Sequence, residues 1–127
     1  LYTSYIHPFF IVQDALEELY GEVCSEDSTF IDYSKIATSS AFVQYLSLTA
    51  LLQRCECTTL PHQERLALFI NLYNGLFLHS CVVNNECAPP SSSLQLSVFR
   101  RSASYTISGY DYTLQDIYNG TKSKSEL

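Results

Sequence analysis

The stretch Glu64–His79, ERLALFINLYNGLFLH, places a glutamate, an arginine, two asparagines and a histidine within a run of large apolar residues. At about 100° per residue, one broad helical arc is mainly apolar and contains Leu66, Phe69, Ile70, Tyr73, Leu76, Phe77 and Ser80. The opposite side carries the polar groups, but leucines occur there as well. A helix that is apolar nearly all round is typical of a central helix covered on both sides. We therefore expect a buried helix over residues 61–83.

The polar groups of this helix form a row, because Asn71, Gly75 and His79 are spaced i, i+4, i+8 and Asn74 lies one turn from Asn71. An unpaired buried amide costs about 1–3 kcal/mol, so these side chains need hydrogen-bond partners. One interpretation is that they bond to the backbone of neighbouring loops. The other makes His79 a general base lining a cleft. Gly75 fits either interpretation, since it lets another segment approach closely.

Two amphipathic helices are predicted upstream of this stretch. Residues 8–20 carry apolar side chains at helical spacing, with proline at the start and Gly21 just past the expected end. Residues 40–54 show a second apolar stripe, capped by Ser39 or Ser40. Both helices would flank the central one.

A β-hairpin is predicted downstream, where apolar and polar residues alternate around Tyr105 and the segment 108–111 supplies a turn. Thr113 and Asp116 then resemble a capping box that opens a short helix through Tyr118. The expected fold is α+β, with a long central helix, flanking amphipathic helices and a small antiparallel β-hairpin packed against one end.

Composition limits the possible partners. A length of 127 residues corresponds to about one domain, and 46% hydrophobic against 16% charged residues is a globular balance. The net charge of −6 makes nucleic acid an unfavourable partner. Residues 66–85 are long enough to cross a bilayer, but polar residues interrupt them, so we expect no membrane insertion. The chain contains no methionine, even at position 1, and we expect it to be a piece of a longer protein.

The cysteines favour a reducing environment. There are five of them, at positions 24, 55, 57, 81 and 87, an odd number without a regular framework. We therefore expect free thiols and an intracellular, cytoplasmic location. Cys55 and Cys57 form a lone Cys-x-Cys near His62 and His79, which is a weak zinc signal without a second matched pair. No metal and no cofactor is predicted.

Two stretches together resemble the domain of unknown function 547 family: ERLALFINLYNGLFLH and the later YTISGYDYTLQDIYNG. Family members carry a similar Arg-Leu-Ala-Phe-Trp-Ile-Asn-Leu-Tyr-Asn-Ala-Leu helix, a Tyr-x-Ile-x-Gly hairpin and a Ser-Leu-x-x-Ile-Glu helix start. The matching positions are Arg65, Asn71, Tyr73, Asn74, His79, Tyr105, Ile107, Gly109, Leu114 and Ile117. In two positions the chain departs from the family: Phe69 replaces a tryptophan and Gly75 an alanine.

The resemblance implies a single partial domain over residues 1–127. Residues 30–120 would form the family-like core, after an N-terminal helix and acidic connector at 1–29 and before a frayed tail at 121–127. Family members continue into a second half with an Asp-x-Arg-Ile-His-Phe-Ala-Leu-x-Cys-Gly segment. Here TKSKSEL stands where that continuation should begin, so we expect a site built from both halves to be incomplete.

Two function hypotheses follow. The resemblance invites comparison with papain-like and transglutaminase-like cysteine enzymes, whose nucleophile starts the central helix and whose histidine lies on the sheet. Here Cys57 lies in the connector before the helix, His62 is the nearby candidate base, and the hairpin has no histidine. The first hypothesis is therefore a non-catalytic assembly or protein-interaction module with protein partners, to which ten tyrosines could contribute contacts. The alternative is such a hydrolase or an inactive remnant of one, with His79, Cys57 and His62 as candidates.

Overall fold

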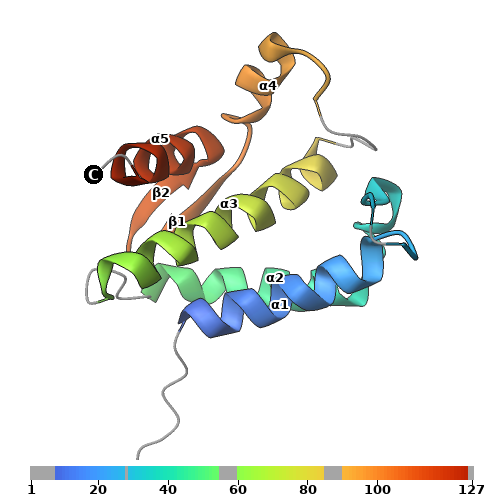
Figure 1. Ribbon diagram of the computed structural model, residues 1–127, viewed down its shortest axis with the longest axis horizontal. Helices are drawn as coiled ribbons and strands as arrows, with labels where there is room; N and C mark the ends of the chain where they lie inside the picture. The colour runs from blue at the N-terminus through green and yellow to red at the C-terminus, as the bar shows by residue number, and fades with distance from the viewer. Residues whose placement is uncertain (1–7, 28, 55–59, 85–89, 126–127) are drawn as a thin grey trace, which may run out of the picture.

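The computed structural model describes residues 8–27, 29–54, 60–84 and 90–125 (Figure 1). In chain order the elements are α1 (Pro8–Val23), η1 (Tyr33–Lys35), α2 (Ser40–Thr49), η2 (Ala50–Arg54), α3 (His62–Val83), α4 (Ser93–Phe99), β1 (Ser104–Ile107), β2 (Tyr110–Thr113) and α5 (Leu114–Ser125). The two strands pair in antiparallel fashion, and the longest helix is central. The predicted α+β fold, with its long central helix and small hairpin, is confirmed.

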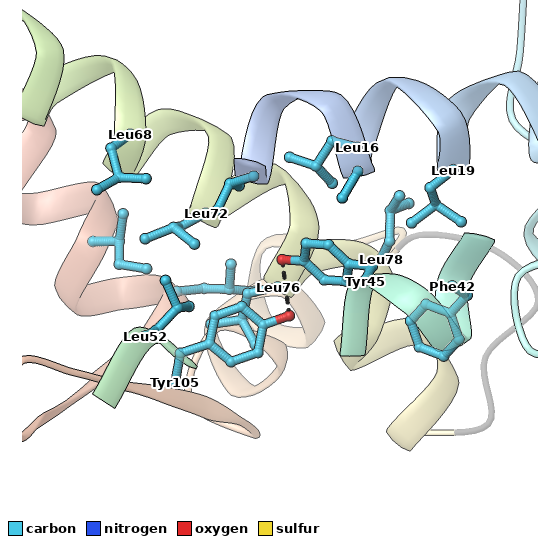
Figure 2. Packing of buried hydrophobic residues seen from close by; sticks show 14 of the residues in the cluster. Leu16, Leu19, Phe42, Tyr45, Leu52, Leu68, Leu72, Leu76, Leu78 and Tyr105 are labelled. Atoms are coloured by element: carbon cyan, nitrogen blue, oxygen red, sulfur yellow. Dashed lines mark hydrogen bonds between the residues drawn. The ribbon is translucent and has the colours of Figure 1, made fainter. Parts of the chain in front are cut away.

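Helix α3 lies between two layers, with α1 packed along one side and α5 along another (Figure 1). The leucines that α3 sends into the core are Leu68, Leu72, Leu76 and Leu78, all at most 2% exposed (Figure 2), and Cys81 of the same helix is fully buried as well. Ile70, which the helical projection placed on the apolar arc, is 47% exposed. The projection was wrong for Ile70 because α3 is apolar on every side. The elements packed against α3, and not its own pattern, decide which apolar side chains are buried.

By length and hydropathy alone, α3 is the one helix in the described ranges that could cross a membrane. The core helix of a water-soluble domain passes the same test. Part of the apolar surface of α3 is covered by α1 and α5, which pack against it.

The start of α2 is fixed by α1. Ser39 caps α2, as predicted, with its side-chain oxygen accepting from the Phe42 N–H at 3.2 Å. Glu22 reaches the same helix end, accepting from the Ser39 hydroxyl at 2.6 Å and from the Ala41 N–H at 3.3 Å. The Ser39 hydrogen bond, followed by that of Ala41, holds the pKa of Glu22 below its ordinary value. The negative carboxylate also suits the positive end of a helix.

Helix α1 runs two residues beyond Gly21, where we expected it to stop, and α2 becomes a 3-10 turn after Thr49 instead of continuing as an α-helix to Arg54. Gly21 is exposed, and a Cβ added there would meet no atom within 4 Å, so the glycine weakens the helix without ending it. The fully buried Val23 in the last turn holds that turn against the core.

The hairpin is tighter than predicted. Its loop is only Ser108 and Gly109, with φ of 52° and 87°, and Tyr110 already belongs to β2. Positive φ at both loop positions is the pattern of two-residue hairpins, and glycine adopts it without strain. The Ser108 N–H donates to the Leu52 carbonyl at 3.0 Å, which anchors the hairpin tip on η2.

The predicted capping box at the start of α5 is confirmed. The Thr113 N–H donates to Asp116 Oδ2 at 3.0 Å, and the Asp116 N–H donates to Thr113 Oγ1 at 3.1 Å. No residue separates β2 from α5. The helix continues to Ser125, so the end predicted at Tyr118 was wrong.

Candidate functional site

The most constrained polar group on the central helix is His79. Its Nδ1 lies 3.1 Å from the Tyr105 hydroxyl oxygen on β1, and the Tyr105 hydroxyl donates to that of Tyr45 on α2 at 3.0 Å (Figure 2). With Tyr105 donating in this way, its oxygen accepts from an N–H at Nδ1 of His79. Three side chains from α2, α3 and β1 thus form one hydrogen-bonded chain, in which both tyrosines are buried and His79 is half-buried.

Gly75 makes room for this chain. A Cβ on Gly75 would overlap the Tyr45 hydroxyl oxygen and would lie 2.5 Å from ring carbon Cζ, closer than any van der Waals contact allows. Tyr45 is 1% exposed, so its ring has no alternative position in solvent. The glycine that replaces the alanine of the family resemblance is therefore explained by Tyr45, which occupies the space of the missing methyl group.

Burial sets the protonation states of the chain. It raises the pKa of Tyr45 and, more strongly, that of Tyr105, whose pKa the neighbouring Tyr45 raises further. Burial also lowers the pKa of His79, which keeps the imidazole neutral at pH 7. The Phe42 ring packs edge-on against the imidazole, with centroids 5.6 Å apart. Both phenols and the imidazole are thus uncharged, which is the state that a partly desolvated polar network requires.

Replacing Tyr105 with phenylalanine is expected to lower the free energy of unfolding by about 1–3 kcal/mol, because the Tyr45 hydroxyl would keep its burial and lose its partner. Tyr45→Phe should cost less, since the Tyr105 hydroxyl would keep the contact with the more exposed His79. Urea unfolding monitored by circular dichroism measures both values. Equal losses for the two variants would mean that the three groups do not act as one chain.

The other predicted positions of α3 lie apart from His79. Asn74 is exposed and Asn71 is half-buried, and no hydrogen bond joins either side chain to another residue of the described segments. The expected bonds from both asparagines to loop backbone are not found within those segments, and they stay a prediction for the rest of the chain. Arg65 and Tyr73 are half-buried, and Gly109 lies at the hairpin turn with positive φ. The roles of these positions stay predictions.

The catalytic candidates are only partly within the described residues. Cys57 and Cys55 lie outside the described residues, while His62 is exposed at the start of α3. Of the described cysteines, Cys24 is half-buried and Cys81 is fully buried. Within the described ranges, His79 hydrogen-bonds to Tyr105, and no group of three or more metal-ligating side chains occurs. His79 is therefore held against the hairpin by this hydrogen bond, and its role as a general base stays a prediction.

A second constellation was missed by the sequence analysis. Helix α4, which the sequence analysis did not predict, is capped by Ser92. The Ser92 side chain accepts from the Gln95 N–H at 3.1 Å, while Gln95 Oε1 accepts from the Ser91 N–H. Serine followed three residues later by glutamine, just before Leu96 and Val98, is a capping-box signal that could have revealed it. The serine and proline content around it favoured a loop and concealed the helix.

Four rings on α3, α4 and α5 form an aromatic floor, which we define as Tyr73, Phe77, Phe99 and Tyr118. The ring centroids of Phe77 and Phe99 are 5.0 Å apart, those of Tyr73 and Phe77 6.4 Å, and those of Tyr73 and Tyr118 6.5 Å. Only Phe99 is fully buried, and the other three are half-buried. Arg100 closes the floor, with its guanidinium carbon 4.4 Å from the centroid of the Tyr118 ring.

Comparison with known proteins identifies one family. The model of the family described as "Protein of unknown function, DUF547" matches residues 57–125, which is more than half of the chain and part of the family's domain. The matched region contains α3, α4, the hairpin and α5. No curated protein and no solved structure matches the chain.

Proposed function

The chain belongs to the DUF547 family, and we propose that this member is a non-catalytic protein-interaction module of a larger intracellular protein. The observation that carries the proposal is the outer face of α4. Leu94 and Val98, spaced i, i+4, expose 77% and 64% of their surface there. Phe99, on the other face of the same helix, is buried against Phe77. Leu94 and Val98 therefore form an apolar stripe that does not contribute to the core.

Burial of this stripe would provide binding energy. Fully burying one leucine or valine side chain contributes about 1.5–3 kcal/mol, and an amphipathic helix with anchors one turn apart can lie in an apolar groove of a partner. Helix α4 lies at the edge of the molecule, at the top of Figure 1 above the C-terminal half of α3, where a partner could reach it. Arg100 and Arg101 follow α4 directly and are the only adjacent basic residues in a chain with net charge −6. This favours a partner segment with apolar and acidic side chains.

The cysteine-hydrolase alternative requires a thiolate within hydrogen-bond reach of a base. His79 is bonded to Tyr105 and His62 is exposed, so neither is held toward a thiol in the described part of the chain. A thiol-directed activity probe tests this alternative independently. Labelling of Cys55 or Cys57 well above that of a denatured control, with loss of a hydrolytic activity in Cys57→Ala, would favour the enzyme.

The interaction proposal is tested with the double variant Leu94→Ser, Val98→Ser in the full-length protein, expressed in its own cells. We expect its complexes to shift to smaller size on native gels, with unchanged thermal stability. The matched control is Val43→Ser, Leu51→Ser, which removes two other exposed apolar side chains, 60% and 57% exposed. The control should leave the complexes intact. Complexes that persist in the α4 variant, or dissociate equally in the control, would contradict the proposal.

A further inference from the structure

Arg100 is held at two points by α5. Its backbone carbonyl accepts from the Gln115 N–H at 3.1 Å, and its guanidinium lies over the ring of Tyr118, one helical turn further along. A guanidinium on an aromatic face is attracted by the ring quadrupole, and its plane becomes oriented. The direction of its N–H groups is therefore defined before any ligand arrives.

One donor of Arg100, its Nε, lacks an acceptor in the described part of the protein and is shielded from solvent. The first turn of α5 does contain a carboxylate, Asp116, but that side chain is occupied in the capping box with Thr113. A shielded guanidinium N–H without an acceptor is costly, and an oxyanion placed beside it would satisfy it.

The surroundings define the ligand further. The aromatic floor adjoins the guanidinium through Tyr118, and Tyr73 and Phe77 continue it along α3. Arg101 beside it is exposed and adds positive charge. A ligand that fits this surface combines one planar oxyanion with an adjacent aromatic or apolar side chain. A long polyanion such as nucleic acid is disfavoured by the net charge of −6.

We propose that Arg100, stacked on Tyr118, binds a carboxylate of an acidic peptide segment whose neighbouring aromatic or apolar side chain packs on the aromatic floor. The planar fork of arginine matches the two oxygens of a carboxylate, and a phosphate group presents a similar edge. This inference rests on the proposed function, because the segment is assigned to the partner that contacts α4. It adds the chemistry by which that partner is recognised.

The test uses the full chain and a peptide probe. The chain contains no tryptophan, so a capped Gly-Trp-Glu-Gly peptide is the only tryptophan emitter in a fluorescence titration. We expect the glutamate peptide to bind. Its glutamine analogue should bind with an affinity at least about tenfold lower, since a charged hydrogen bond contributes about 1.5–3 kcal/mol. A phosphoserine analogue that binds more tightly would support the oxyanion site and identify phosphate as the natural source.

Matched variants locate the binding. Arg100→Gln should lower the affinity about tenfold and Arg100→Lys nearly as much, because lysine keeps the charge and loses the fork, whereas Arg101→Gln should change it less than about threefold. Tyr118→Phe keeps the ring and should retain binding. Thermal unfolding of each variant excludes loss of fold. Equal affinity for the glutamate and glutamine peptides, or equal effects at Arg100 and Arg101, would overturn the inference.

The two proposals can fail separately. If the peptide behaves as expected while Leu94→Ser, Val98→Ser keeps its cellular complexes, the carboxylate site stands and the role of α4 is wrong. If that double variant loses its complexes but the peptide does not bind, the interaction module stands and the carboxylate inference is overturned.

Discussion

Replacing Leu72 with alanine is expected to lower the free energy of unfolding by about 2–5 kcal/mol, the range for truncation of a fully buried leucine. Leu72 is 0% exposed and lies on the side of α3 that meets α1 and the core leucines (Figure 2). The cavity left behind would be enclosed by other packed side chains and could not fill with water. Equilibrium unfolding in urea, with the slope checked for constancy, measures the loss.

Ile70→Ala is the matched control on the same helix. Ile70 is 47% exposed, although its place in the sequence is as apolar as that of Leu72. We expect its replacement to cost less than about 1 kcal/mol, partly compensated by the higher helix propensity of alanine. Equal losses at the two positions would mean that α3 does not turn its leucine face toward α1.

Replacing Gly75 with alanine is expected to destabilise the protein by about 1–3 kcal/mol or more, as overpacking of a closed core does. The sign of this change in the free energy of unfolding is informative, because glycine-to-alanine replacement in the middle of an unobstructed helix stabilises a protein by about 0.5–1 kcal/mol. Here the added methyl would collide with the hydroxyl and Cζ of Tyr45, and that ring is held by Tyr105 and by its own burial.

Gly21→Ala supplies the internal comparison, because Gly21 lies within α1 and no atom is near its missing Cβ. That variant should gain stability. In a Tyr45→Ala background, the penalty of Gly75→Ala should vanish, which a double-mutant cycle detects as a coupling energy. Stabilisation by Gly75→Ala in the native background would contradict the packing of Tyr45 against α3.

The features that could be predicted from the sequence are those that depend on residues close together in the chain. The capping box at Thr113 and Asp116 and the Ser39 cap each depend on residues within one helical turn, and both were predicted. The same kind of signal preceded α4 at Ser92 and Gln95, but the surrounding serine and proline residues outweighed it. The burial of Leu72 and exposure of Ile70 could not be predicted, because α3 is apolar on all sides.

The candidate site was predictable only in part. The resemblance marked both His79 and Tyr105 as family positions, but the bond between them joins residues 26 apart in the chain, and that between Tyr105 and Tyr45 spans 60. No local periodicity encodes such pairings. We expected Gly75 to let another chain segment approach closely, whereas its close neighbour is the side chain of Tyr45. The pairing of Arg100 with Tyr118 depends on the direct passage from β2 into α5 and had no local signal.

The direct passage from β2 into α5 affects both the association rate and the affinity of a ligand bound at Arg100. The hairpin tip is bonded to η2, β2 enters α5 without a linker, and the Gln115 N–H is bonded to the Arg100 carbonyl, so the backbones that carry Tyr118 and Arg100 are tied together. The loss of side-chain freedom that usually opposes association has therefore already occurred during folding. A receptor of this kind needs no closing motion, so its association rate would be limited by diffusion and orientation, and differences between ligands would lie in how long they stay bound.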